Sequence, residues 1–429
     1  MRVLIVGSGG REHALAWKLA QSPRLSALFA APGSDGMVSL ATCLPVASAL
    51  DADALIAHAA AQRIDLVVVG PEDPLAAGLA DRLRAAGLAV FGPSAAAAQL
   101  ESTKAFARAF MARRGIPHPR FEVCTELPAA ERAVRARAGR CVVKADGLAA
   151  GKGVAVCSSE AEALAALGEM MGARRFGEAG ARVVIEDVLV GEEASYLVVT
   201  DGERVVPFAP AQDHKRALDG DRGENTGGMG AYAPAPLVSE AVEKRVLEEI
   251  VHPTLRGMRA EGAPFSGVLY VGLMIDPAGA PSVVEFNCRF GDPETQVILM
   301  QMEGDLLPLL DGAARGRLDE ALRIRGEGAA VCVVLASGGY PREFAKGKRI
   351  TGLGAAEQLP GVVVFHAGTK RSGEGFVTNG GRVLGVTARG ASFAEARERA
   401  YAAADLIAFD GKQLRRDIGA RVLARTTAG

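Results

Sequence analysis

The chain has 429 residues, which at roughly 150 residues per domain predicts about three domains, each with a core of its own. Its 49 basic and 50 acidic side chains give a net charge of -1, which excludes an overall field that would hold nucleic acid or an anionic membrane. An apolar content of 49% and a charged content of 23% exclude a disordered chain, so any phosphate site has to be local.

The start of the chain carries no pattern that would send it to a membrane or out of the cell. The first apolar run ends at Gly7 without a signal cleavage pattern, and the longest uncharged stretch, residues 85–100, is interrupted by Gly92 and Pro93. The six cysteines are spread singly and form neither a zinc knuckle nor a C-x-x-C pair. We therefore expect a cytoplasmic protein with reduced thiols and no membrane or nucleic-acid partner. As a separate expectation, which these patterns do not carry, we expect the protein to be a monomer.

The first hundred residues alternate short apolar runs with helical stretches. Strands are predicted at 2–6, 65–69 and 88–91, and helices at 11–20 and 75–86. This order favours a parallel, doubly wound sheet in an N-terminal domain of residues 1–102. A longer helical region over 94–114 is stopped at residues 115–117 by glycine and proline.

Shorter elements follow and predict a small α+β subdomain over about 120–192, inside a central domain of residues 103–325. Its strands are expected at 121–124, 141–144, 154–157 and 183–186, and its helices at 128–138 and 160–171. Strands are expected to dominate from 193 to about 325, around a polar stretch at 212–230 that is too long for a simple turn.

The last predicted domain covers residues 326–429 and begins with a strand at 329–335. A glycine-rich hairpin is predicted at Asn379-Gly380-Gly381. An amphipathic helix follows, with one apolar side formed by Phe393, Ala396, Ala400, Ala404 and Ile407. The predicted class is therefore α/β and α+β, in several domains.

Two glycine-rich turns are candidates for phosphate binding. The first, at residues 7–13, has Glu12 where the third glycine of a dinucleotide-binding turn belongs, so it suits a single phosphate or only a packing turn. The second contains Gly147, Gly151 and Gly153 between two strands, and its spacing excludes a P-loop. Lys144 and Lys152 would add charge there, and the alternative is a hairpin with solvated lysines.

A strand predicted at 281–287 is the candidate metal site. Alternation puts Glu285 and Asn287 on one face and Val284 and Phe286 on the other. Two oxygen ligands on one face suit magnesium, which takes its other ligands from nucleotide phosphates and water. The alternative is an exposed edge strand, although a dense group of charged residues follows, comprising Arg289, Asp292 and Glu294.

Taken together, the motifs resemble the glycinamide ribonucleotide synthetase family. The resemblance runs from Val3 to about Val386 and is carried by GGREHA at 9–14, KADGLAAGKG at 144–153, QDHK at 212–215, TGGMGAY at 226–232, EFNCRFGDPETQ at 285–296 and HAGTK at 366–370. It implies an ATP-grasp fold with an N-terminal Rossmann-like pre-ATP-grasp domain and a small C-terminal domain. It also implies ATP-dependent ligation of glycine to 5-phosphoribosylamine in purine synthesis, through a glycyl phosphate.

The resemblance also implies roles for single residues. ATP would be bound by Lys104, Lys144, Asp146, Gly147, Gly151, Lys152, Gly153, Glu186, Val188 and Glu193, and Mg²⁺ or Mn²⁺ by Glu285 and Asn287. Arg289, Lys144 and Lys152 would stabilise the charge of phosphoryl transfer. Gly9, Gly10 and Arg11, with Lys370 and Arg382, would bind the ribose phosphate, and Asp213, Asp292 or Glu294 would meet the glycine ammonium or the ribose hydroxyls. His214, Lys215 and Arg289 complete the expected substrate site, and His214 either positions a substrate or caps its loop.

Two rival interpretations remain. Another ATP-grasp enzyme, such as a carboxylase or a formyl-transferring purine enzyme, is opposed by the string RFGDPE at 289–294 and by the lack of a biotin-carrier Met-Lys-Met. A silent nucleotide-binding module is opposed by the presence of Lys144, Glu285, Asn287 and Arg289.

Overall fold

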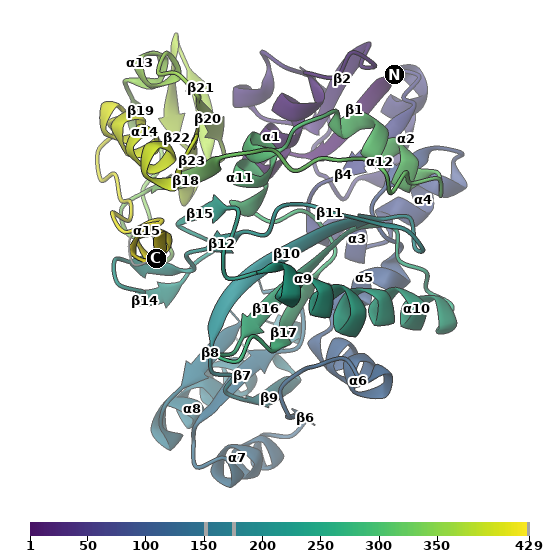
Figure 1. The fold of residues 1–429 in the computed structure, drawn as a ribbon, viewed down its shortest axis with the longest axis vertical. Coiled ribbons are helices and arrows are strands. Elements are labelled where there is room, and N and C mark those ends of the chain that lie inside the picture. Colours follow the sequence, from purple (N-terminus) through teal and green to yellow (C-terminus); the bar gives the residue numbers. More distant parts are fainter. Residues whose placement is uncertain (150–152, 174–176, 427–429) are drawn as a thin grey trace.

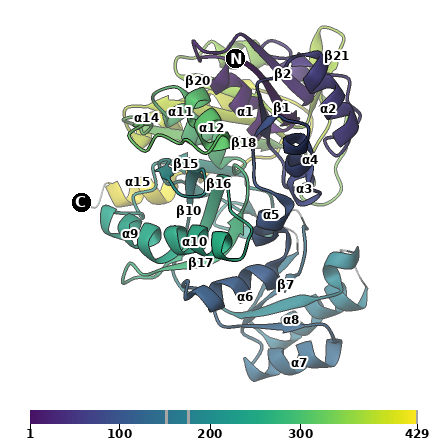
Figure 2. The ribbon, with the colours of Figure 1, turned by 90° about the vertical axis from the view of Figure 1, so that its right-hand side faces the viewer.

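The structure is a computed structural model that describes residues 1–149, 153–173 and 177–426. The described residues form one parallel sheet, three antiparallel sheets of four or five strands and two smaller sheets. The subdomain that carries α7 and α8 projects away from the rest (Figures 1 and 2). The predicted class of α/β and α+β in several domains is confirmed. Among the described residues, none of the helices is long and apolar enough to span a membrane.

The N-terminal part is built on a parallel five-stranded sheet in the order β3-β2-β1-β4-β5. Its strands are β1 (Arg2–Gly7), β2 (Ala27–Pro32), β3 (Thr42–Cys43), β4 (Leu66–Val69) and β5 (Ala89–Phe91), and its helices are α1 (Gly10–Leu19), α2 (Ala52–Ala61), α3 (Glu72–Ala76) and α4 (Leu79–Ala85). The single helix predicted at 75–86 is wrong. Gly78, at a φ of +81°, separates α3 from α4, and α3 already begins at Glu72.

The helical region predicted at 94–114 is two helices, α5 (Ala95–Ser102) and α6 (Lys104–Arg114). Thr103 between them has an extended backbone, with φ -137° and ψ 99°. This break starts a new helix at Lys104, whose first turn faces the following subdomain because the Asp146 carboxylate accepts the Ala105 N–H at 2.9 Å. The interruption therefore matters for the site.

The subdomain predicted at 120–192 has the expected elements. A sheet in the order β6-β9-β7-β8 contains β6 (Phe121–Cys124), β7 (Cys141–Ala145), β8 (Val154–Cys157) and β9 (Val183–Asp187). Two helices, α7 (Leu127–Ala136) and α8 (Glu160–Leu167), cover one side, and Ala130, Val134, Val143 and Ile185 are among the residues of the shared core.

The central sheet has the order β11-β10-β16-β17 and is antiparallel. It consists of β10 (Glu192–Thr200), β11 (Val205–Pro207), β16 (Gly267–Ile275) and β17 (Pro281–Asn287). The prediction that strands dominate residues 193–325 is confirmed only in part, because helices occupy nearly as much of this region as its eight strands do. Four helices lie in this region, α9 (Glu240–Arg245), α10 (His252–Ala260), α11 (Glu294–Gln301) and α12 (Leu306–Ala314), with a π-helical segment at Val246–Val251.

The polar stretch 212–230 is structured and contributes to two sheets. β13 (Arg216–Leu218) and β14 (Arg222–Asn225) form a hairpin, whereas β12 (Gln212–Asp213) and β15 (Gly230–Ala233) join the C-terminal strands in the order β12-β15-β18-β23-β20. This sheet crosses the border that the sequence predicts at 325. It therefore ties the central region to the end of the chain.

The C-terminal part adds β18 (Ala329–Ala336), β19 (Arg349–Ile350), β20 (Val362–His366), β21 (Thr369–Ser372), β22 (Gly375–Thr378), β23 (Arg382–Gly390), α13 (Leu353–Glu357), α14 (Phe393–Leu406) and α15 (Ala420–Thr426). The amphipathic helix is confirmed as α14. The hairpin predicted at 379–381 is wrong, because β22 pairs with β19 and β21 while β23 pairs with β18 and β20. The glycines there connect two sheets, and the tight hairpin lies at Gly373, which has a φ of +59°.

Candidate active site

A cleft of about 640 Å³ lies between the subdomain sheet, β6-β9-β7-β8, and the central sheet, β11-β10-β16-β17. These are called the two central sheets below. The β6–β9 subdomain contributes Val142, Lys144, Val154 and Glu186, and the central sheet contributes Glu193, Tyr270, Glu285 and Asn287. The N-terminal part reaches the cleft with Arg11, Glu72 and Glu101, and the C-terminal part with Arg382. Most of the predicted site residues in the described chain therefore line one cavity, although they are distant in sequence.

A buried group of charges joins the two sheets. Arg108 on α6 donates to both carboxylate oxygens of Glu186, at 2.6 and 2.8 Å, and Lys144 Nζ lies 2.9 Å from Glu186 Oε2. Burial alone would raise the pKa of Glu186, but Lys144 and Arg108 lower it. Burial and the neighbouring Arg108 lower the pKa of Lys144, against the pull of Glu186. Both oxygens of the Glu186 carboxylate are thus engaged by cations.

A bulge in β17 decides what faces the cleft. Gly272 pairs with Glu285 and Leu273 with Val283, so Val284 is an extra residue. Val283 and Phe286 lie in the core, although Phe286 also reaches the cavity wall, whereas Val284 lies outside the core and lines the cleft beside Glu285 and Asn287. The predicted sharing of one face by Val284 and Phe286 is wrong for this reason.

The carbonyl oxygens at the bulge hold the two buried cations in place. Val284 O accepts from Lys144 Nζ at 3.0 Å and from Arg108 Nη2 at 2.6 Å, and Val283 O accepts from Arg108 Nη1 at 3.0 Å. The bulge therefore links the strand that carries Glu285 to the cations of the opposite sheet.

Glu285 and Asn287 both present oxygen atoms to the cleft. Burial would raise the pKa of Glu285, but Lys215, Lys144, Lys104 and Arg289 lower it to about 2, so the carboxylate is ionised at physiological pH. Lys215 Nζ lies 3.8 Å from Glu285 Oε1 and 2.9 Å from Glu193 Oε2. In the described part of the chain, there is no group of three or more His, Cys, Asp or Glu side chains that would hold a metal alone. The donor set fits Mg²⁺ or Mn²⁺ only if nucleotide phosphates supply further oxygens.

The second glycine-rich turn is partly described. Ala150, Gly151 and Lys152 lie outside the described residues, so the structure says nothing of their predicted roles. Lys104 Nζ donates to Gly147 O at 3.0 Å. A Cβ atom on Gly147 would lie 2.6 Å from the Ala179 Cβ, so the approach of this backbone requires glycine.

Asp146 and Gly153 flank the undescribed residues of this turn. The Asp146 carboxylate accepts hydrogen bonds from the Ala105 N–H and from Arg182 Nε. These bonds indicate that Asp146 anchors the glycine-rich turn and does not itself contact a phosphate. A Cβ on Gly153 would lie 2.7 Å from the Ala149 Cβ. Both residues shape the turn rather than supply charge to the cleft.

The first glycine turn begins α1 and is closed by Glu12. The Gly9 N–H donates to Glu12 Oε2 at 2.7 Å, and Arg11 Nε donates to Glu12 Oε1 at 2.5 Å. Arg11 also donates to Phe290 O at 3.1 Å and lines the cleft although it is only 8% exposed. A Cβ on Gly10 would lie 2.9 Å from Gln296 Nε2, so this turn packs directly against α11.

Asp292, Glu294 and Arg382 lie where the central and C-terminal parts meet. Arg382 Nη1 donates to Asp292 O at 2.6 Å and to Gly227 O, and its Nη2 lies 3.2 Å from Asp292 Oδ2. Glu294 Oε1 accepts from the Tyr270 hydroxyl at 2.6 Å and from Ser195 Oγ at 3.1 Å. Each of the two carboxylates thus has fixed partners.

Asp213 differs from the other acidic residues of the cleft. Within the described residues, every other cleft-lining carboxylate has an ion pair or a hydrogen bond, and Asp213 has neither. Burial raises its pKa to about 7, and the nearby Glu294, Glu193 and Glu285 act in the same direction against Lys215. It is therefore free to accept a cationic or hydrogen-bonding group.

Six of the predicted site residues in the described chain do not line the cleft, namely Gly9, Gly10, Asp146, Gly147, His214 and Lys370. His214 is 4% exposed, packs on Tyr232 with ring centroids 5.9 Å apart, and does not line the cavity. Lys370 is exposed on β21 and is likewise absent from the cavity lining. For His214 the structure favours the loop-packing role over substrate positioning.

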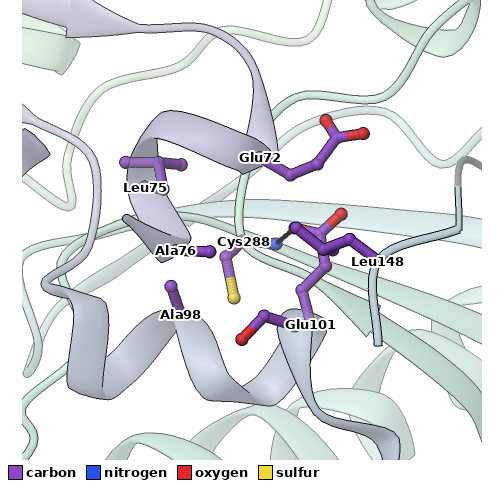
Figure 3. A pocket seen from close by; sticks show the side chains of 8 residues that line it. Glu72, Leu75, Ala76, Ala98, Glu101, Leu148 and Cys288 are labelled. Atoms are coloured by element: carbon purple, nitrogen blue, oxygen red, sulfur yellow. Dashed lines mark hydrogen bonds between the residues drawn. The ribbon is translucent and has the colours of Figure 1, made fainter. Parts of the chain in front are cut away.

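Sequence reasoning missed Glu72, Glu101, Arg108 and Tyr270. Figure 3 shows Glu72 and Glu101 beside Cys288, each from a different helix of the N-terminal part. Glu101 Oε1 lies 3.0 Å and Glu72 Oε2 3.1 Å from the guanidinium of Arg289. None of the four belongs to a sequence motif that would have identified it. They are recognised as site residues only because the structure buries them against predicted site residues.

Comparisons with known proteins agree along the whole chain. Models of the phosphoribosylglycinamide synthetase N domain, ATP-grasp (A) domain and C domain match residues 1–101, 102–295 and 330–421. The chain is 52% identical over 429 residues to a phosphoribosylamine–glycine ligase of Vibrio cholerae, covering 100% of both, and 51% identical over 427 residues to that of Escherichia coli K12, covering 99% of both.

Solved structures give the same result. The crystal structure of a phosphoribosylamine–glycine ligase from Thermotoga maritima matches with a TM-score of 0.84 at 35% identity, covering 97% of this chain and 100% of that one. A biotin carboxylase domain from Hydrogenobacter thermophilus, solved with MgADP and bicarbonate, matches with a TM-score of 0.73 at 16% identity, covering 96% and 91%. At that identity the second match concerns the fold alone.

Proposed function

The chain belongs to the phosphoribosylglycinamide synthetase family and is an ATP-dependent ligase of the ATP-grasp fold, and from this premise we propose which of its residues perform each step. The reaction joins glycine to 5-phosphoribosylamine and converts ATP to ADP and phosphate, in purine biosynthesis. We further propose that the enzyme acts as a cytoplasmic monomer.

ATP is proposed to lie along the cleft between the two central sheets. The phosphates meet Lys104, Lys144 and the turn that begins at Asp146 and ends at Gly153, including Gly147, Gly151 and Lys152. Adenine meets the chain at Glu186 and Val188, around the end of β9, where Arg108 and Lys144 hold the Glu186 carboxylate. Glu193 meets the ribose, and its partner Lys215, at 2.9 Å, lies between it and Glu285.

Glu285 and Asn287 are proposed to hold Mg²⁺ or Mn²⁺ together with the phosphates. The observation that carries this proposal is that both side chains face the same cavity as Lys104, Lys144 and Lys215. With a divalent cation held by these two side chains, the site would supply positive charge that offsets the charge of the phosphates.

The chemistry follows from the poor reactivity of a carboxylate, which is anionic and has oxide as its leaving group. In the first step a carboxylate oxygen of glycine attacks the γ-phosphorus of ATP, and ADP leaves, which gives glycyl phosphate. In the second step the amine of phosphoribosylamine attacks the acyl carbon, phosphate leaves and the amine loses a proton. Arg289, Lys144 and Lys152 stabilise the charge of the transferring group, so a nucleophilic protein side chain is not required.

Substrates are proposed to approach from the side opposite the adenine. Gly9, Gly10, Arg11 and Arg382 bind the ribose phosphate of phosphoribosylamine, with Asp292 fixed by Arg382 beside them. Lys370 would have to reach this group from an exposed strand. Asp213 accepts the glycine ammonium. Its carboxylate has no hydrogen bond or ion pair with the described residues, whereas the Glu294 carboxylate already accepts from Tyr270 and Ser195.

Water has to be kept from glycyl phosphate, which hydrolyses readily. We propose that the subdomain of residues 120–192 closes over the cleft as a lid before phosphoryl transfer. The ion pairs of Glu186 with Arg108 and Lys144 would then act at the junction of this lid and the central sheet.

The test of the function is ADP release with each substrate omitted in turn. A glycine–phosphoribosylamine ligase forms glycinamide ribonucleotide and releases ADP steadily only when both are present. A related carboxylase would ignore glycine, and a silent nucleotide binder would release nothing. Either of the latter results would contradict the proposal.

A further inference from the structure

The guanidinium of Arg289 is held on several sides. Its Nε donates to Glu72 Oε2 at 3.1 Å, its Nη2 contacts Asn287 Oδ1 at 3.2 Å and Glu101 Oε1 at 3.0 Å, and its Nη1 donates to Phe290 O at 3.2 Å. Of the five N–H groups of this side chain, these contacts with described residues leave one on Nη1 for a substrate oxygen. The side chain is only 16% exposed.

Glu101 is fixed as firmly as the arginine that it holds. Its side chain is 8% exposed, and its second oxygen, Oε2, accepts the Cys288 N–H at 2.7 Å. One carboxylate therefore binds both the backbone and the side chain of consecutive residues, 288 and 289. Such a two-point contact fixes the direction in which the arginine leaves the backbone.

Glu72 connects the same arginine to a second one. The Oε2 atom that contacts Arg289 Nε at 3.1 Å also lies 3.7 Å from Arg11 Nη1. Burial would raise the pKa of Glu72, but Arg289 and Arg11 lower it to about 2, so the carboxylate is ionised. Arg11, Glu72 and Arg289 thus form a continuous row of charges.

Both carboxylates come from the N-terminal part of the chain. Glu72 begins α3 and Glu101 lies in the last turn of α5 (Figure 3). Arg289, in contrast, follows the strand β17 of the central sheet. A charge-stabilising arginine of one domain is therefore oriented by two residues of another.

We propose that Glu101 and Glu72 are positioning residues that aim the Arg289 guanidinium at the transferring group. This inference rests on the role proposed above for Arg289. A guanidinium on a flexible side chain stabilises a transition state only if it is already in place, and a displacement of about 1 Å costs up to about a hundredfold in rate. The two carboxylates remove that freedom and leave one donor for the substrate.

The test is Glu101→Gln, which keeps the shape of the side chain and removes its charge. We expect kcat for ADP release to fall by about 10- to 100-fold while KM for ATP changes by less than about twofold, since transition-state stabilisation and not nucleotide binding is lost. Glu261→Gln is the matched control, because both oxygens of Glu261 are also engaged, in this case by Arg113 and Arg114, but Glu261 does not line the cleft. Its kcat should equal that of the wild type.

A double-mutant cycle with Arg289→Ala separates positioning from a structural role. If Glu101 acts through Arg289, Glu101→Gln has no further effect on kcat in the Arg289→Ala background. Losses that multiply in the double variant, or an unchanged kcat in Glu101→Gln, would overturn the inference. Thermal unfolding and the stoichiometry of binding of a non-hydrolysable ATP analogue verify that each variant is folded.

A substitute variant and a wild-type control distinguish failure of this inference from failure of the proposed function. If Glu101→Gln fails to fold, the same cycle is run with Glu72→Gln, whose side chain is 25% exposed and tolerates substitution more easily. A wild-type enzyme that fails to release ADP with both substrates refutes the proposed function. A wild-type enzyme that turns over while Arg289→Ala keeps full activity refutes only the positioning inference and the role of Arg289.

Discussion

Arg108 and Glu186 form a bidentate ion pair, with distances of 2.6 and 2.8 Å, and each side chain is only 3% exposed. Lys144 contacts the same carboxylate at 2.9 Å. A single buried acid therefore holds the α6 arginine and the lysine that is proposed to meet the ATP phosphates. Its position at the junction of the two central sheets makes this group a determinant of both stability and ATP binding.

Replacing Arg108 by alanine is expected to weaken both properties. Removing one partner of a buried ion pair costs about 3–5 kcal/mol, because a charge is left without compensation. Among the described residues, Lys144 would then be held only by Glu186, which has lost its bidentate partner, and by the Val284 carbonyl. KM for ATP should therefore rise by about tenfold or more, in line with about 1.4 kcal/mol per factor of ten. Thermal unfolding and ATP titration measure the two effects.

The control for this prediction is Arg113→Ala on the same helix. Arg113 is 51% exposed and pairs with Glu261 at the surface, where an ion pair contributes about 0–1 kcal/mol. An Arg108→Ala enzyme that resembled this control in stability and in KM for ATP would contradict the account.

Glu285→Ala should abolish metal-dependent turnover in a folded protein. The substitution removes one of the two oxygen ligands, and we expect turnover at saturating ATP and Mg²⁺ to fall by about a hundredfold or more, as with the loss of a charge-stabilising group. Because the pKa of Glu285 is lowered to about 2, metal binding by the wild type should not weaken between pH 6 and 8 on account of this residue. Glu240→Ala, on the exposed start of α9, is the control. Full activity of Glu285→Ala would reject the metal assignment.

Arg11→Ala should act on phosphoribosylamine and not on ATP. Arg11 lines the cleft beside the start of α1, and its removal takes a fixed cation from the proposed phosphate site. We expect KM for phosphoribosylamine to rise by about tenfold or more with KM for ATP nearly unchanged, as for loss of one charged contact. Equal KM values for phosphoribosylamine in the variant and the wild type would refute this placement.

Asp213 should impose a pH dependence on the use of glycine. Its pKa is raised to about 7 by burial and by neighbouring carboxylates, so it is protonated below that pH and cannot attract the glycine ammonium. The kcat/KM for glycine is therefore expected to rise as pH increases through 7, and Asp213→Asn should have a lower and flatter profile. Identical profiles in variant and wild type would refute the ammonium role.

The raised pKa of Asp213 also makes the stability of the folded protein depend on pH, and the direction of this dependence can be measured. A pKa raised in the folded protein means that the folded state holds the proton more tightly than the unfolded chain. The contribution of Asp213 to stability is then complete below its ordinary pKa of 3.8 and is lost as pH rises through about 7. Asp213→Asn should accordingly raise the unfolding temperature at pH 8 more than at pH 4, and the opposite order would contradict the burial of this carboxylate.

Local sequence patterns predicted the elements that depend on nearby residues. The strand at Arg2–Gly7, the helix after its glycine turn, the four strands of the subdomain and the amphipathic α14 are all present. Glu285 and Asn287 also face the same side as predicted, because they lie two positions apart in the part of β17 that pairs regularly with β16 after the bulge. The bulge itself, at Val284, depends on the register with β16 and has no local signature.

Contacts between distant segments could not be predicted in this way. Glu72 and Glu101 act on Arg289 from helices that lie about 200 positions earlier, and neither stands in a motif of its own. Glu12 was visible only as a departure from a glycine pattern, whereas the structure uses it to close the turn at Gly9. The hairpin predicted at Asn379 failed because its two strands pair with other partners.

The most direct measurement is a crystal structure of the protein soaked with Mg²⁺ and a non-hydrolysable ATP analogue. The account predicts density for the cation at the Glu285 carboxylate and the Asn287 amide oxygen, with the phosphates between them and the Lys104 and Lys144 side chains. Nucleotide or cation density remote from these residues would contradict it.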